Sequence, residues 1–368
     1  MISRLTSFLS GETKTKKVEK KVGGSGKNIK QFTVCAPYIV PAGEQTGEGK
    51  QTKNGTITKG ECLKKDAKTK KCTKYKAVKK VKSVHKDSCL TPDVLKMLVT
   101  AWNKEYPNEY IIYKEPLTIV WETLRNKITN HVPLEEGEHA WLEQDWVYSA
   151  LTEAKAEKLK DELYRPEAPD EWRNNPRAWL STTDIEEALQ QYEVKFPTFK
   201  FFGASPIDFD LKNNTGSCVV NSLCKLNLKQ LIKGRNPAID FIGVVFNLDK
   251  HNESGSHWVA LFVNIPKGEI NFWDSFAVNP PPEIMKLMKK IQTQANALGI
   301  KLKIQINKKQ HQFKNTERGM YSINFIAKQL EGKSFSEVCA HIINDDKMNG
   351  MRNEYFTVDS STVDTVES

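Results

Sequence analysis

The feature that most constrains the fold of this chain is an apolar run at residues 238–248, which reads Ala-Ile-Asp-Phe-Ile-Gly-Val-Val-Phe-Asn-Leu. A near-continuous apolar run is typical of a β-strand that is covered on both faces. Two more strand patterns follow at residues 258–265 and 269–275, and the turn Pro266-Lys267-Gly268 between them predicts a hairpin. We therefore expect an α+β fold with helices on both faces of a central sheet.

Further helical and strand patterns supply the layers around this sheet. They predict helices at residues 283–298, 320–330 and 335–345, and a half-buried strand at residues 300–306. Gly299 follows the first of these helices, as a C-cap glycine does. Another helix is expected after Trp179-Leu180, with Thr183 or Asp184 as its N-cap.

The first part of the chain divides into a Lys- and Gly-rich extension and a helical block. The block begins with Thr91 as an N-cap and Pro92 in the first turn, and it continues with helical patterns at residues 117–130 and 138–164. The segment Pro166-Glu167-Ala168-Pro169 indicates a linker. We divide the chain into a basic extension, a helical arm domain, a larger α+β domain and a mobile tail, at residues 1–86, 87–165, 166–356 and 357–368.

Charge is unevenly distributed along the chain. Residues 1–90 hold 22 Lys and Arg against 7 Asp and Glu, a net charge of +15, and the remainder holds 33 against 38, a net charge of −5. Such a basic segment attracts polyanions, so residues 1–86 are candidates for nucleic-acid contact. The alternative is a solvated basic extension without such a partner.

Cysteine usage and hydropathy narrow the setting. Seven cysteines, an odd number at no repeating spacing, indicate reduced thiols in a cytosolic compartment. Cys62 and Cys72 have only His85 near them, too few ligands for zinc, so we expect no metal or other cofactor. A run of about 18 apolar residues is absent, and so is a signal-peptide cleavage site, so we expect no membrane span and no secretory signal.

Two polar residues of the predicted hairpin are placed to transfer protons. His257 follows the turn Ser254-Gly255-Ser256 and precedes the first strand, and Asp274 lies at the end of the second. A carboxylate beside an imidazole fixes its tautomer and stabilises the imidazolium, which suits a general base. The alternatives are a structural histidine on an apolar strand and an aspartate that caps a turn.

Together with Gln312 and the segment Glu317-Arg318-Gly319, this order of residues resembles the Ulp1/adenain-type cysteine proteases. The resemblance covers residues 165–345 and is closest to the core-protein-maturing proteases of large cytoplasmic DNA viruses, of the asfarvirus and mimivirus type. Lys86-Asp87-Ser88-Cys89-Leu90 resembles their N-terminal arm. The family implies a papain-like, Ulp1-like catalytic domain with a mixed central sheet flanked by helices, after a helical arm domain.

The resemblance also implies roles near the predicted helix start. Gln312 matches the amide that would donate to the oxyanion with a backbone N–H, and Asn315 is the competing amide. Arg318 stands where the family has the nucleophilic cysteine of Glu-Cys-Gly. A guanidinium has no lone pair with which to attack a carbonyl, so we expect the chain as written to be inactive. A deliberate or recent Cys-to-Arg change would explain this, and a natural pseudoenzyme is the alternative.

Two tryptophans and the family suggest the substrate. Trp179 matches a residue of the family's substrate tunnel, with an ordinary buried tryptophan as the alternative, and Trp258 would form a channel wall. Such a channel admits small residues, which implies cleavage after Gly-Gly or Ala-Gly. We interpret the chain as a cysteine endopeptidase that matures viral core or capsid precursors in the virion and host cytoplasm. The alternatives are a deconjugase of ubiquitin-like modifiers and a non-catalytic pseudoprotease that binds Gly-Gly tails or nucleic acid.

The basic extension contains two sequences of the implied substrate type. These are Gly23-Gly24-Ser25 and Ala42-Gly43-Glu44. Our hypothesis is that the active enzyme cuts its own extension there, which would make the extension removable or regulatory. The alternative is that both sequences are flexible turns.

Overall fold

The computed structural model describes residues 34–42, 79–131 and 137–357, which all belong to one compact unit spanning residues 31–368. The candidate cleavage site at Gly23-Gly24, Gly43 of the second candidate site, Cys62, Cys72 and the tail after residue 357 lie outside the described residues. The hypotheses that depend on them therefore stay predictions.

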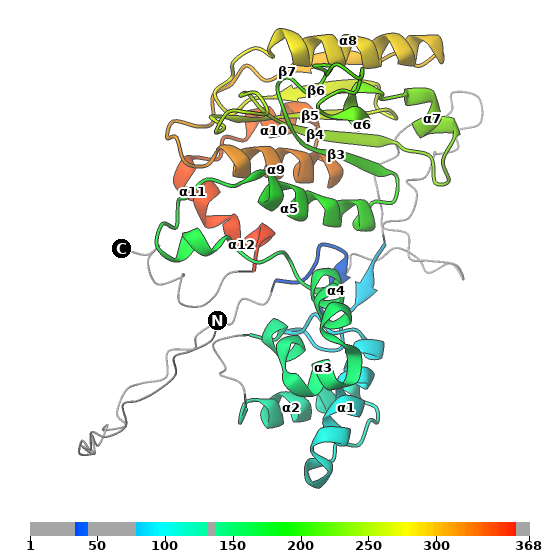
Figure 1. Ribbon diagram of the computed structural model, residues 1–368, viewed down its shortest axis with the longest axis vertical. Helices are drawn as coiled ribbons and strands as arrows, with labels where there is room; N and C mark the ends of the chain where they lie inside the picture. Colours follow the sequence, from blue (N-terminus) through cyan, green and yellow to red (C-terminus); the bar gives the residue numbers. More distant parts are fainter. Residues whose placement is uncertain (1–33, 43–78, 132–136, 358–368) are drawn as a thin grey trace, which may run out of the picture. The chain divides into compact units, whose positions relative to one another are not determined.

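A mixed five-stranded sheet forms the centre of the larger domain (Figure 1). Its strands, in their order across the sheet, are β3 (Phe199–Pro206), β4 (Phe241–Asn247), β5 (Trp258–Asn264), β6 (Glu269–Trp273) and β7 (Lys303–Ile306). The outer pairs β3–β4 and β6–β7 are parallel, and the inner pairs β4–β5 and β5–β6 are antiparallel. The mixed sheet and the β5–β6 hairpin predicted from the sequence are confirmed.

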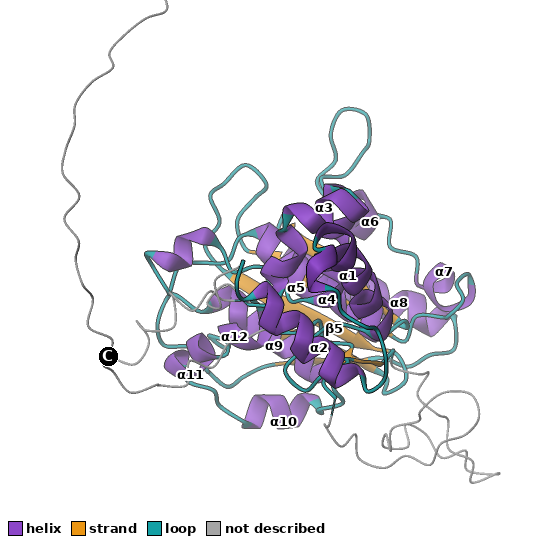
Figure 2. Ribbon diagram, turned by 90° about the horizontal axis from the view of Figure 1, so that it is seen from below, coloured by secondary structure: helices purple, strands orange, loops and turns teal. Residues whose placement is uncertain are grey.

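Helices cover both faces of the sheet, as the apolar run of β4 predicts. Val245 and Phe262 pack in the core shared with α5 and α9, whereas Val244 and Leu261 pack on the opposite face against α8 (Figures 1 and 2). This alternation follows from the two-residue period of a strand. No helix within the described ranges is both long and apolar enough to cross a membrane. The helices of this domain are α5 (Thr182–Lys195), α6 (Asn221–Cys224), α7 (Leu228–Lys233), α8 (Pro282–Ala297), α9 (Arg318–Leu330), α10 (Phe335–Ala340), α11 (Asp345–Gly350) and α12 (Arg352–Tyr355).

The ends of two helices test the predicted caps. Ser181 is the N-cap of α5, so the expectation of Thr183 or Asp184 was wrong by two or three residues. The physical reason is a capping box, in which the Ser181 hydroxyl accepts from the Asp184 N–H at 3.2 Å and the Asp184 carboxylate accepts from the Ser181 N–H at 2.6 Å. At the other end of the domain, Gly299 follows α8 with φ +75°, which confirms its expected conformation.

The preceding region is helical and has a core of its own. Thr91 caps α1 and Pro92 occupies its first turn, as predicted. Residues 138–164 do not form the single helix expected, because Thr152 takes φ +73° and separates α3 from α4. The elements of this region are β1 (Ile39–Val40), β2 (Val81–Lys82), α1 (Pro92–Glu105), α2 (Leu117–Ile128), α3 (Asp145–Leu151) and α4 (Glu153–Leu163), with 3-10 turns at Pro107–Glu109 and His139–Glu143, and a further 3-10 turn at Asp170–Arg173 in the linker.

Part of the predicted extension packs into this helical region. β1 and β2 pair in parallel, and Ala36, Tyr38 and Val84 are buried in the same core as Trp102 of α1. Segments 34–42 and 79–85 thus contribute to the folded arm although both lie before residue 87.

Two disulfides differ from the expected reduced thiols. Cys35 is bonded to Cys89 and Cys218 to Cys224, with Cα separations of 5.2 and 6.3 Å. Both separations lie within the range of about 4.4–6.8 Å that a disulfide spans. The first pair is 54 residues apart in sequence and meets because segment 34–42 folds onto the arm, so spacing alone could not reveal it. Cys339 is the free cysteine among the described residues.

Candidate active site

His257 is held at the start of β5 by the turn before it. Gly255 has φ +88°, and a Cβ there would lie 2.5 Å from Asn247 Nδ2, so only glycine suits this turn. The His257 carbonyl then accepts from the Leu248 N–H at 2.9 Å, which fixes the backbone beside β4. The imidazole is buried, with 9% of the residue exposed. The sequence therefore places this ring at the N-terminal end of the central strand β5.

The hairpin brings Asp274 to the imidazole. In the antiparallel register Ala260 pairs with Trp273, which places the residue after Trp273 near the start of β5. His257 Nε2 lies 2.7 Å from Asp274 Oδ1. The same carboxylate accepts backbone N–H bonds from Phe276 at 2.9 Å and Val278 at 3.2 Å. Asp274 thus both orients the imidazole and caps a turn, so the two expectations for this residue are compatible.

The other nitrogen of the His257 ring has no partner. Since an ionised carboxylate only accepts hydrogen bonds, the bond to Asp274 assigns a proton to Nε2, so the neutral imidazole would carry its lone pair on Nδ1. Nδ1 is buried and has no hydrogen-bond partner among the described residues. The ring packs against Phe276, with ring centroids 5.1 Å apart. This is the protonation state that a general base requires.

Gln312 is fixed next to this pair by the residue that follows Asp274. Its side chain is fully buried, and its Oε1 accepts from the Ser275 hydroxyl at 2.6 Å. Its backbone N–H donates to the Ser275 carbonyl at 3.1 Å. The amide nitrogen donates one hydrogen bond to the Lys314 carbonyl at 2.5 Å, and a primary amide carries a second N–H. Gln312 is therefore oriented with its oxygen satisfied and one donor to spare.

Arg318 is the first residue of α9 and lies beside the same aromatic ring. Its guanidinium carbon is 5.7 Å from the Phe276 ring and 5.2 Å from the Trp179 ring, and Nη2 donates to Asn315 Oδ1 at 2.9 Å. Burial lowers the pKa of Arg318, and the charge of Asp274 opposes this change. Phe276 therefore lies beside both the imidazole and the guanidinium of the residue that begins α9.

The two tryptophans singled out from the sequence differ in exposure. Trp179 is 50% exposed and contacts Arg318, so it is not the ordinary buried tryptophan of the alternative reading. Trp258 is buried and donates from Nε1 to the Leu180 carbonyl at 3.2 Å. A Cβ at Gly319 would lie 3.0 Å from Leu180, so glycine permits α9 to approach this segment closely. Trp258 thus braces the Trp179-Leu180 segment against the helix start.

A buried ion pair under the α9 start was not anticipated. Glu317 is fully buried and accepts from Arg352 Nη2 at 3.0 Å, while Arg177 Nη1 lies 3.6 Å away. Arg352 also donates to the Ala178 carbonyl at 3.0 Å and stacks 4.1 Å from the Trp172 ring. The sequence marks Glu317 only as part of a short motif, and Arg352 carries no spacing signal because it lies 35 residues away.

The described residues contain no alternative cysteine nucleophile and no metal centre. Cys339 lies in α10, as expected, and burial raises the pKa of its thiol to about 11, which disfavours the reactive thiolate. Cys218 and Cys224 are joined to each other. No group of three or more His, Cys, Asp or Glu side chains within the described ranges could hold a metal ion.

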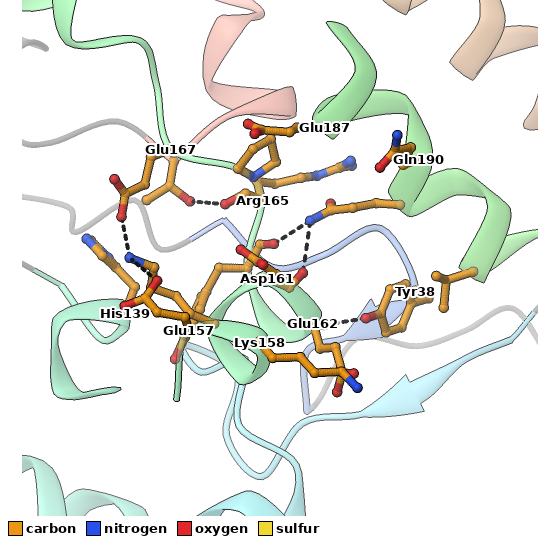
Figure 3. A pocket seen from close by; sticks show the side chains of 16 residues that line it. Tyr38, His139, Glu157, Lys158, Asp161, Glu162, Arg165, Glu167, Glu187 and Gln190 are labelled. Carbon is orange, nitrogen blue, oxygen red and sulfur yellow. Dashed lines mark hydrogen bonds and ion pairs between the residues drawn. The ribbon is translucent and has the colours of Figure 1, made fainter. Parts of the chain in front are cut away.

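The cavity drawn in Figure 3 is lined by none of the predicted site residues. It has a volume of about 480 Å³ and is lined mainly by α4 and α5. Lys160 bonds to Glu167 at 2.7 Å, and Gln191 Nε2 donates to the Tyr164 carbonyl at 2.6 Å. The first bond joins α4 to the linker and the second joins α5 to the residue that follows α4, and these internal bonds give the cavity a structural explanation.

Comparison with known proteins shows which family the larger domain resembles. The model of the Ulp1 protease family, C-terminal catalytic domain, matches residues 198–365. A relative in Acanthamoeba polyphaga mimivirus, assigned as a thiol protease, is 32% identical over 204 residues, which are 54% of this chain and 63% of the relative. This chain therefore spans less than two thirds of that relative. A SUMO-1 cysteine protease of African swine fever virus is 29% identical over 196 residues, 50% of this chain and 70% of the relative.

Similarity of structure extends to the arm. The crystal structure of an African swine fever virus protease matches with a TM-score of 0.54 at 21% identity, and the match covers 74% of this chain and 92% of that one. At this identity the match shows a shared fold. The order of strands, the match over residues 198–365 and the viral relatives agree. Residues 198–365 of this chain match the C-terminal catalytic domain of the Ulp1 protease family.

Proposed function

We propose that this chain is, by descent, a cysteine endopeptidase that matures viral core or capsid precursors, and that Arg318 in the nucleophile position makes it inactive as written. The observation that carries the proposal is the buried His257–Asp274 pair at 2.7 Å, with Phe276 between the imidazole and the first residue of α9. Gln312 adds an amide that is oriented by Ser275, the residue after Asp274. These groups support acyl transfer once a thiol stands at position 318.

The proposed chemistry in an Arg318→Cys variant has two halves. His257 Nδ1 takes the proton of the introduced thiol, and the sulfur attacks the scissile carbonyl. The oxyanion accepts hydrogen bonds from Gln312 Nε2 and a backbone N–H of α9, and the imidazolium then gives its proton to the leaving amine. Water, deprotonated by the same imidazole, attacks the thioester and releases the carboxylic acid and the thiol. Asp274 would stabilise the imidazolium throughout.

The substrate proposal is cleavage after Gly-Gly or Ala-Gly. Trp179 and the Trp258-braced Leu180 segment lie beside Arg318, and bulky aromatic walls leave room for residues without side chains. We infer that the substrates are structural precursor proteins of a virus, because the relatives are viral proteases. The virion and the host cytoplasm are the corresponding proposed locations.

The test compares four proteins on fluorogenic peptides that contain Gly-Gly, Ala-Gly or Leu-Leu before the scissile bond. The unmodified chain should be inactive, and Arg318→Cys should cut the first two peptides. Adding His257→Gln to Arg318→Cys should abolish cutting, and adding Arg235→Gln, a change at an exposed loop residue, should not. An inactive but folded Arg318→Cys protein would refute the assignment of position 318.

A deconjugase of ubiquitin-like modifiers is the second candidate, because relatives from African swine fever virus are described as SUMO-1 cysteine proteases. A deconjugase recognises the folded modifier as well as its tail. The Arg318→Cys protein should then cut a modifier fusion at least tenfold faster than the matching peptide. Equal rates would favour the endopeptidase.

Two further proposals concern the basic extension, most of which lies outside the described residues. We propose that residues 1–86 contact nucleic acid, with affinity that falls steeply as salt rises. Segments 34–42 and 79–86 are in the described structure, so the suitable variant lacks residues 1–33 and carries Gln for the ten lysines of residues 43–78. Unchanged affinity of that variant would reject the assignment. Self-cleavage at Gly24 or Gly43 would give a new N-terminus in the Arg318→Cys protein.

A further inference from the structure

Among the described residues, Arg318 differs from Arg352 and Arg177 near the α9 start because it forms no ion pair with a carboxylate. Arg352 pairs with Glu317 at 3.0 Å, and Arg177 pairs with Asp346 at 2.6 Å. By contrast, Arg318 bonds only the neutral amide of Asn315 among the described residues, and its Nε is buried without a hydrogen-bond partner. A half-buried guanidinium with an unused donor is suited to an external anion.

The nearby carboxylate does not neutralise Arg318 directly. Both oxygens of Asp274 are already engaged, Oδ1 by His257 and the Phe276 N–H and Oδ2 by the Val278 N–H. Glu317, the N-cap residue of α9, is held by Arg352 and makes no side-chain cap. The first turn of this 13-residue helix therefore keeps unpaired N–H groups and the positive end of its dipole beside Arg318.

A second buried group, His257, lies against the same Phe276 ring as Arg318. Only 9% of His257 is exposed, and its Nδ1 has no hydrogen-bond partner among the described residues. Since Asp274 occupies Nε2, Nδ1 lies on the side of the ring turned away from that carboxylate, and the shared neighbour Phe276 places the ring close to Arg318. An anion at the helix start can thus meet a guanidinium and backbone N–H groups, whereas Nδ1 donates to it only in the imidazolium form.

The aromatic rings define the shape of the ligand. Trp179 and Phe276 lie 5.2 and 5.7 Å from the guanidinium carbon, so they restrict its plane. Trp179 is half exposed, which opens the site to solvent. A planar carboxylate can accept two parallel hydrogen bonds from a guanidinium of fixed orientation, and a spherical anion cannot. Gly319 leaves no side chain between α9 and Leu180, which lets the helix start pack closely against this segment.

We propose that Arg318 converts this site into a receptor for the free C-terminal carboxylate of a peptide that ends in Gly-Gly. The carboxylate class follows from Arg318 and the α9 start. The Gly-Gly class rests on the proposed function, because it assumes the substrate groove of the protease. The chain would then hold the acid product of a cleavage that it does not perform itself.

The test uses the full chain and a fluorescein-labelled hexapeptide ending in Gly-Gly, made once as the free acid and once as the C-terminal amide. Fluorescence anisotropy should show about 10- to 100-fold tighter binding of the acid, as expected for hydrogen bonds to a charged group. Arg318→Gln should remove the preference for the acid, and Arg318→Lys should keep part of it, because a single charge remains without the paired N–H geometry. Arg235→Gln, in an exposed loop between α7 and β4, is the matched loss of one positive charge and should change nothing.

The outcomes separate this inference from the proposed function. Equal affinities for acid and amide in the unmodified chain overturn the carboxylate receptor, even if Arg318→Cys cuts Gly-Gly peptides. An acid preference that depends on Arg318, together with an inactive Arg318→Cys variant, supports the receptor and overturns the protease. A preference for the acid that is equal for Gly-Gly and Leu-Leu endings overturns the tail specificity alone.

Discussion

Replacing Arg352 by methionine removes one partner of the buried ion pair beneath the α9 start. Glu317 has no exposed surface, and Arg352 is 4% exposed, so neither charge is hydrated in the folded protein. Burial lowers the pKa of Arg352, and Glu317 opposes this change, as expected of two charges that stabilise each other. Methionine has a similar length and no charge, so the change leaves little empty volume and isolates the electrostatic effect.

The expected loss follows from the isolation of Glu317. Removing one partner of a buried pair costs about 3–5 kcal/mol, because the remaining charge stays buried without compensation. Arg177 remains 3.6 Å from Glu317 but is 38% exposed, so it offsets only part of the loss. The contact of the guanidinium with the Trp172 ring at 4.1 Å adds about 0.5–2 kcal/mol. We expect a decrease of about 3–5 kcal/mol in the free energy of unfolding, or roughly 6–20 °C in Tm for a domain of this size.

The assay is urea unfolding followed by tryptophan fluorescence, with circular dichroism as a second probe. The control is Arg173→Met, since Arg173 is 59% exposed and its ion pair with Asp170 is 3.7 Å long at the surface. Surface pairs contribute about 0–1 kcal/mol, so this variant should unfold close to the unmodified chain. A loss below about 1 kcal/mol for Arg352→Met would contradict the view that the pair anchors α9.

The remaining predictions concern the reactive groups, and the first two use the Arg318→Cys protein. Asp274→Asn should lower kcat by about 10³–10⁴, because an amide can stabilise the wrong imidazole tautomer; an unchanged kcat with normal folding would exclude this role. Gln312→Ala should lower kcat by about 10²–10³ through loss of one oxyanion donor, and Asn315→Ala should have the larger effect if Asn315 is the donor instead. Cys339 should react slowly with iodoacetamide at pH 7 and faster as pH rises toward its pKa of about 11, measured by mass spectrometry; fast reaction at pH 7 would contradict its burial.

The sheet and the His257–Asp274 pair could be predicted because each depends on a short-range pattern. A run such as 238–248 allows few environments, and the hairpin at Pro266-Lys267-Gly268 fixes which strands are neighbours. Once the hairpin is known, the distance between His257 and Asp274 follows from the register. The break at Thr152 could not be predicted, since threonine rarely adopts φ +73° and tertiary contacts decide it.

Long-range pairings were hidden for the opposite reason. Cys35 and Cys89, like Glu317 and Arg352, are neighbours only after separate segments have packed, and no local pattern records the partner. A sequence motif shows which residues an active site needs, but it does not show what fixes them in place. Glu317 illustrates the difference, because a glutamate at the N-cap of α9 suggests a cap or a favourable charge near the helix dipole.

In the structure Glu317 pairs with Arg352 and does not cap α9, and this pairing affects the charge beside Arg318. A free carboxylate at the helix start would attract the guanidinium of the next residue and neutralise it. Glu317 does not do so, because Arg352 and Arg177 each lie next to one of its two carboxylate oxygens. In the Arg352→Met variant, a Glu317 side chain that turned to Arg318 would regain part of the lost stability, and the preference for a peptide acid over its amide would fall to the same extent. The same substitution therefore tests the anchor through unfolding and the carboxylate receptor through binding. A variant that loses stability yet keeps its full acid preference would show that Glu317 and Arg318 act independently.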